Sequence, residues 1–76
     1  MANYGENLRN ARIKAGMTQS ELAEKTSTTQ AMITQCERGS KMPTVGLAVL
    51  IAETLGTTCE ELVNGKENAN ERTETV

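Results

Sequence analysis

The sequence contains no histidine, tryptophan or phenylalanine, and Tyr4 is its one aromatic residue. Without histidine, the chain lacks the side chain most often used as a general base and as a metal ligand. Its two cysteines, Cys36 and Cys59, do not form a C-x-x-C pair, and two thiolates cannot complete a tetrahedral zinc site. We therefore expect no metal and no cofactor, and we predict that the protein is not an enzyme.

Long apolar runs are also missing. The longest, at residues 45–52, is interrupted by Gly46 and is much shorter than the roughly 20 residues that a membrane-spanning helix needs. The first residues have neither the basic region nor the apolar region of a signal peptide. We therefore expect a cytoplasmic protein with no membrane partner, in which both thiols are reduced.

Basic charge is scarce as well. The formal net charge is -2 and the pI is near 5.1, whereas nucleic-acid-binding domains are usually basic. This balance argues against binding to nucleic acid. The 76 residues leave room for one small domain, and its core must be built from leucine, isoleucine, valine, methionine and alanine.

Apolar residues at helical spacing, separated by capping residues and glycines, run through the first 65 residues, without the alternating pattern of strands. The sequence therefore predicts an all-α fold, a compact bundle of five short helices at residues 4–15, 19–25, 30–37, 45–55 and 59–63. Isolated helices of this length are marginal, so packing must hold them together. Residues 1–65 should form one domain, and the polar segment 66–76 should be disordered.

Threonines predict where the helices begin. Thr18, followed three residues later by Glu21, has the spacing of a capping box. Thr29, Thr44 and Thr58 precede the last three predicted helices as N-caps. The side chains expected to face the core in the first three helices are Tyr4, Leu8, Ala11, Ala15, Leu22, Ala23, Ile33 and Cys36.

The second and third predicted helices carry the most information about function. Two short helices joined by a three- to four-residue turn have the layout of a helix-turn-helix. In such a unit the second helix projects from a rigid platform, so its first side chains can reach base edges in the major groove. The N-terminus of the first helix offers free N–H groups to a backbone phosphate.

Residues 17–39, MTQSELAEKTSTTQAMITQCERG, resemble the phage repressor/Cro-type (XRE) helix-turn-helix family. Further similarity lies at residues 8–12, 43–56 and 59–65, so the resemblance covers roughly residues 4 to 65. It implies the five-helix DNA-binding domain of that family. It also implies sequence-specific binding of a double-stranded DNA operator by a homodimer, most often to repress transcription, with no small-molecule ligand evident.

The resemblance assigns roles position by position. The residues expected to read bases are Gln30, Ala31, Thr34 and Gln35, although Thr34 can also be expected against sugar or backbone. The residues expected to contact phosphates are Gln19, Thr29, Arg38 and Lys41. Arg12 and Glu37 match an ion pair between the first helix and the end of the third. Glutamine can pair bidentately with adenine, and alanine and threonine methyl groups suit thymine, which favours an A·T-containing half-site.

Two features depart from the family pattern. Ser27 stands where the family's turn usually has glycine, and if φ is positive there a serine costs about 1 kcal/mol. The helix predicted at residues 45–55 has almost no polar face. Burial would explain it, but Leu47 and Leu50, together with Val63, predict a self-association surface. A dimer would double the phosphate contacts of a chain with few cations, and would set two reading helices about 34 Å apart.

Two other functions remain open at this stage. One is a protein-interaction module, such as an antitoxin or an anti-repressor partner, whose acidic segment from Glu67 folds on a basic partner. The other is a small thiol enzyme using Cys59, which has little support because the sequence offers no base for it. Cys36 stands where the family usually has an aliphatic residue, so we expect it to pack in the core.

Overall fold

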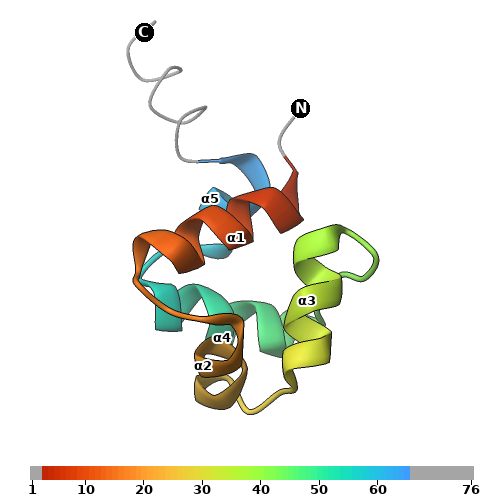
Figure 1. The fold of residues 1–76 in the computed structure, drawn as a ribbon. Coiled ribbons are helices and arrows are strands. Elements are labelled where there is room, and N and C mark those ends of the chain that lie inside the picture. The colour runs from red at the N-terminus through yellow and green to blue at the C-terminus, as the bar shows by residue number, and fades with distance from the viewer. Residues whose placement is uncertain (1–2, 66–76) are drawn as a thin grey trace, which may run out of the picture.

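The structure of the chain is a computed structural model that describes residues 3–65, which form five α-helices and no strand (Figure 1). The helices are α1 (Tyr4–Lys14), α2 (Gln19–Lys25), α3 (Gln30–Arg38), α4 (Val45–Leu55) and α5 (Cys59–Asn64). The predicted all-α fold is therefore confirmed, and each predicted helix end lies within one residue of the observed one. The prediction of a disordered segment at residues 66–76 lies outside the described residues.

Each of these helices begins at a polar N-cap whose side chain accepts a hydrogen bond from the backbone N–H three residues later. At the start of α2 the bond is reciprocal, because Thr18 accepts from Glu21 N at 3.0 Å and donates its own N–H to Glu21 Oε1 at 2.9 Å. The capping box and the three other threonine caps are confirmed. The cap of α1, Asn3, was not predicted.

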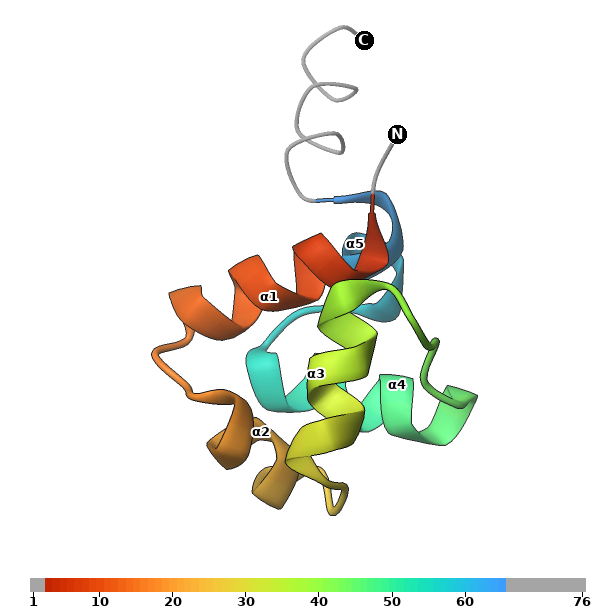
Figure 2. The same ribbon diagram turned by 45° about the vertical axis from the view of Figure 1, so that its right-hand side comes forward.

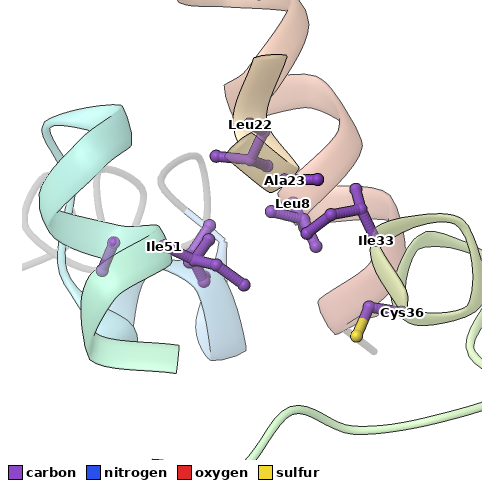
Figure 3. Close-up of a cluster of buried hydrophobic side chains, with 8 residues drawn as sticks. Leu8, Leu22, Ala23, Ile33, Cys36 and Ile51 are labelled. Atoms are coloured by element: carbon purple, nitrogen blue, oxygen red, sulfur yellow. The ribbon is translucent and has the colours of Figure 1, made fainter. Parts of the chain in front are cut away.

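The core collects side chains from all five helices. Figure 3 shows how the side chains of Leu8, Leu22, Ile33 and Ile51 converge from four of them. The buried cluster consists of Leu8, Leu22, Ala23, Ile33, Cys36, Ile51, Ala52 and Leu62. The predicted inward residues of α2 and α3, Cys36 included, are therefore confirmed. The prediction for Ala15 is wrong, because this residue caps the end of α1 and is exposed.

The helix α3 lies at the edge of the bundle, on the right in Figure 1 and turned toward the viewer in Figure 2. It packs against α1 and α2. The contact with α1 is unusually close, since a Cβ atom built on Gly5 would lie 2.5 Å from the carbonyl oxygen of Glu37 and 2.6 Å from that of Cys36. The first turn of α1 therefore rests directly on the backbone at the end of α3.

The turn between α2 and α3 contains a strained residue. Ser27 has φ +59°, a left-handed conformation that residues other than glycine rarely adopt. The turn is held by two backbone hydrogen bonds, from Ser27 N to Glu24 O and from Thr28 N to Ala23 O. The condition under which serine is costly at this position is therefore met.

Within residues 3–65, none of the helices has both the length and the apolar character needed to cross a membrane.

Candidate nucleic-acid interface

The four residues predicted to read bases lie on one outward face of α3. Gln30, Ala31, Thr34 and Gln35 are spaced so that they share one side of a helix with 3.6 residues per turn. Gln30 and Ala31 are exposed, and Thr34 and Gln35 are half-buried. The opposite side of α3 carries Ile33, which is fully buried. The structure therefore brings the four together on a face that the core does not need.

Three of the four residues predicted to contact phosphates lie at the two ends of this face. Thr29 is exposed at the N-terminal end, and its hydroxyl accepts a hydrogen bond from Met32 N at 3.1 Å. Arg38 is exposed at the C-terminal end of α3, and Lys41 is exposed in the loop that follows. That loop folds back on the helix, because the backbone N–H of Lys41 donates to Gln35 O at 3.3 Å.

Gln19, the fourth of these residues, is half-buried and uses both ends of its amide inside the protein. Its Nε2 donates to Glu37 Oε1 at 2.9 Å, and its Oε1 accepts from the Thr34 hydroxyl at 2.8 Å. Gln19 therefore bridges the first turn of α2 to α3. These bonds could not be predicted from local sequence patterns, since they join residues 18 and 15 positions apart. The amide has a second N–H that these two bonds do not use.

Arg12 and Glu37 form the predicted ion pair. Arg12 Nε lies 2.6 Å from Glu37 Oε2, and one of the terminal nitrogens of Arg12 donates to Oε1 at 3.3 Å. The other terminal nitrogen donates to the carbonyl oxygen of Met17 at 2.8 Å. The two side chains are only 12% and 4% exposed. The pair therefore joins α1, the segment before α2 and the end of α3 in a largely water-free position.

Two ionisable side chains in this region have pKa values that burial raises further above neutral pH. Burial raises the pKa of the Cys36 thiol, and the negative charge of Glu37 raises it further. Burial also raises the pKa of Tyr4 to about 12, with smaller contributions from Cys36 and Cys59. Within residues 3–65, the Tyr4 hydroxyl is a buried group without a hydrogen-bond partner. The raised pKa values leave both groups uncharged at neutral pH, as expected of packing residues.

Among residues 3–65, no group of three or more cysteine, aspartate or glutamate side chains is placed to hold a metal ion.

Exposed apolar side chains gather on α4 and at the end of α5. Leu50 is 44% exposed and Val63 is 51% exposed, as the predicted self-association surface requires. Leu47 does not meet that requirement, because it is half-buried and packs against the core. Val45 and Val49, which were not predicted to belong to this surface, are also exposed on α4. Their spacing of four residues places them on one side of the helix and could have identified them as a pair.

The comparisons with known proteins agree with this geometry. Residues 8–62 match the model of the family described as helix-turn-helix. No curated protein sequence matches the chain. Solved structures similar to it include the P22 c2 repressor protein in complex with a synthetic operator, at 23% identity and a TM-score of 0.82, covering 87% of this chain and 100% of that one. At this identity the likeness shows the fold.

Two further structures are similar. The clp gene regulator ClgR of Corynebacterium glutamicum is 28% identical with a TM-score of 0.75, and the alignment covers 91% of this chain and 87% of that one. A complex of the SinR and SinI proteins is 22% identical with a TM-score of 0.76, covering 93% of this chain and 72% of that one. In each case the alignment spans most of both chains.

Proposed function

Because the chain belongs to the helix-turn-helix family, whose fold is that of DNA-binding transcriptional regulators, we propose that it binds a specific duplex DNA operator as a homodimer. The helix α3 enters the major groove, and occupancy of the operator represses transcription. The protein acts in the cytoplasm and carries no catalytic activity. The similar P22 c2 repressor structure, which contains a synthetic operator, supports DNA as the partner.

The observation that carries this proposal is the outward face of α3. On the core side of α3, the buried Ile33 and Cys36 hold the helix in position, and Gly5 makes a close contact with its C-terminal end. Gln30 presents an exposed amide, which can donate to and accept from an adenine at the same time. Ala31 presents a methyl group suited to thymine. A rigid helix with such side chains is what direct readout of A·T pairs needs.

The scarcity of cations favours a dimer. Residues 1–65 contain six lysines and arginines against seven glutamates, so one copy can neutralise few phosphates and should bind weakly. Two copies double the phosphate contacts made by Gln19, Thr29, Arg38 and Lys41. The exposed Leu50 and Val63 offer apolar surface for the second copy. Leu47 is left out of this surface because it packs against the core.

Selection of bound sites from a pool of random duplex DNA, at one fixed ionic strength, tests the proposal. We expect enrichment of two inverted half-sites whose centres lie about one turn of B-DNA apart, or roughly 34 Å, with A·T pairs in each half. A pool carried through the same cycles without protein is the control. No enrichment would contradict specific DNA binding, and enrichment of single half-sites would contradict the dimer.

A protein-interaction module is the second candidate, in the form of an antitoxin or an anti-repressor partner. Val45 is 82% exposed and lies with the exposed Val49 and Leu50 on α4, a helix other than the one that carries the predicted base-reading residues. The similar SinR structure is a complex with SinI. Deleting residues 66–76 separates the two candidates. DNA binding should survive the deletion, whereas a partner that the acidic segment recruits should be lost.

A further inference from the structure

Four polar side chains form a continuous series of hydrogen bonds from the inside of the protein to the outward face of α3. Arg12 donates to Glu37, Gln19 also donates to Glu37, and Thr34 donates to Gln19. The donor–acceptor distances along this series are 2.6, 2.9 and 2.8 Å. We call these four residues the Arg12–Thr34 network. It ends at a side chain that is half-buried and lies among the predicted base-reading residues.

The chemistry of the inner pair fixes the direction of every bond in the network. A guanidinium group can only donate and a carboxylate can only accept. Gln19 must therefore turn its NH2 group toward Glu37, which leaves its carbonyl oxygen facing Thr34. A carbonyl oxygen can only accept, so the single hydroxyl hydrogen of Thr34 is used inside the protein. Thr34 keeps free lone pairs and a methyl group, but it has no hydrogen to donate outward.

We infer that Thr34 is a specificity-determining residue that offers DNA a hydrogen-bond acceptor and no donor. The inference rests on the proposed function, because it concerns the face of α3 that would enter the major groove. In that groove adenine N6 and cytosine N4 donate, whereas guanine O6 and N7 and thymine O4 accept. The base that faces the Thr34 oxygen should therefore be adenine or cytosine, in preference to guanine or thymine.

The ion pair sets this preference without touching DNA. Glu37 is 4% exposed, and its Oε1 accepts from both Arg12 and Gln19. A glutamine at position 37 would keep its oxygen toward Arg12 Nε, where the shorter bond lies, and present its NH2 group to Gln19, at the loss of the 3.3 Å bond from the terminal nitrogen of Arg12. The Gln19 amide would then turn over and donate to the Thr34 oxygen. The Thr34 hydrogen would be released to the outside, where it could be given to guanine or thymine.

A purely structural network would behave differently. If the network only held α2 against α3, its loss would weaken binding to all sequences by a similar factor. If it orients the Thr34 hydroxyl, its loss changes which base is preferred at one position of each half-site. The base preference at that position therefore separates a positioning role in recognition from simple stabilisation.

Site selection from random duplex DNA with matched variants tests the inference. We expect the wild-type protein to enrich adenine or cytosine about fivefold at one position of each half-site, as one net hydrogen bond allows. Thr34→Val, which keeps the shape but has no hydroxyl, should lose this preference. Thr34→Ser, which keeps the hydroxyl, should bind more weakly through its lost methyl group but show the same preference. Glu37→Gln should shift the preference toward guanine or thymine.

Gln19→Leu is the second variant if Glu37→Gln does not fold, as judged by circular dichroism and thermal unfolding. It frees the Thr34 hydroxyl to donate as well as accept, so the preference should broaden to all four bases. Selected sites that keep the preference in Thr34→Val, or in a folded variant at position 19 or 37, would overturn the inference alone. A wild-type protein that enriches no site would overturn the proposed function and the inference with it.

Hydrogen exchange of the Thr34 hydroxyl proton tests the inference in the absence of DNA. In the free wild-type protein this proton is held by Gln19 Oε1 at an oxygen–oxygen distance of 2.8 Å, so it should exchange with water slowly enough to be seen by NMR. In Glu37→Gln or Gln19→Leu it should exchange too fast to be seen. A proton that exchanges fast in the folded wild-type protein would contradict the bond direction on which the inference depends.

Discussion

Arg12 Nε meets Glu37 Oε2 at 2.6 Å in a position where the carboxylate is almost completely removed from water. The pair connects the packing of the fold with the candidate site. Arg12 also donates a hydrogen bond to the carbonyl oxygen of Met17 before α2, and Glu37 also accepts one from Gln19. A change at this one contact should therefore affect both the stability of the bundle and the side chains beside the reading face.

Arg12→Ala should lower the free energy of unfolding by about 3 kcal/mol, because it leaves the Glu37 carboxylate buried without its cation. Urea unfolding followed by circular dichroism measures this loss. Arg9→Ala is the matched control, since Arg9 is exposed on the same helix and should cost less than about 0.5 kcal/mol. A double-mutant cycle with Glu37→Ala should show strong coupling, and additive losses would contradict the pair's role.

Two glycines predict opposite effects for the same substitution. Gly5→Ala should lower the free energy of unfolding by about 2 kcal/mol, because its Cβ would lie 2.5 Å from the backbone oxygen of Glu37. Gly46→Ala should raise it by up to about 1 kcal/mol, because nothing lies within 4 Å of a Cβ built there and the residue is inside α4. Thermal unfolding of the two variants checks both signs. Equal effects would show that α1 does not rest on the end of α3.

Ser27→Gly should stabilise the protein by about 1 kcal/mol, because glycine adopts a positive φ without the strain that a Cβ atom causes. The φ of +59° at Ser27 lies in this region. Gly39→Ala is the reverse control, since φ is +83° there and nothing crowds a Cβ atom, so it should lose about 1 kcal/mol. A rise in the urea midpoint for Ser27→Gly, and a fall for Gly39→Ala, would be the expected pair of results.

Most of the fold could be predicted from the sequence because its signals are local. A threonine cap acts on the N–H three residues later, so Thr18 could be identified as a cap without knowing the packing. For Ser27 the only sign was the glycine that the similar family usually has at this position, since serine itself does not indicate a positive φ. Burial of Cys36 also followed from its place among the apolar residues of α3. The prediction that Ala15 is buried was wrong because helical spacing does not show where a helix ends, and Ala15 is the exposed C-cap of α1.

The candidate site could be predicted only in outline. The outward face of α3 follows from helical spacing, but the bonds of Gln19 do not. Its amide meets Glu37 and Thr34 across 18 and 15 residues of chain, and such contacts depend on how two helices are placed in space. Leu47 illustrates the same limit, because only the packing of α4 decides which of its many apolar residues face the core.

Substitutions on the outward face of α3 should reduce the ability of the protein to distinguish its operator from other DNA. Gln30→Ala and Gln35→Ala should each weaken binding to a selected operator by about 1–3 kcal/mol. Binding to random DNA should change little, and the circular dichroism spectrum of the folded protein should not change. Mobility-shift titrations on both DNAs measure this. Lys41→Ala is the contrasting variant, because a phosphate contact should weaken binding evenly and reduce the salt slope by about one. Operator binding unchanged in both glutamine variants would mean that another face reads the DNA.

The apolar surface predicts different results at neighbouring leucines of α4. Leu50→Glu, and Val63→Glu on α5, replace side chains that are 44% and 51% exposed, so the monomer should stay folded while the dimer dissociates. Leu47→Glu would place a charge against the core and should lower the free energy of unfolding, because Leu47 is half-buried and a charge there loses part of its contact with water.

Analytical ultracentrifugation and circular dichroism of the three variants separate self-association from folding. Glu53→Gln, an exposed polar change on the same helix, should alter neither and serves as the control. Dimers that persist in both Leu50→Glu and Val63→Glu would place the contact between copies elsewhere. A dissociated dimer would also make the DNA affinity of these variants fall to that of a single half-site, because half of the phosphate contacts would be lost.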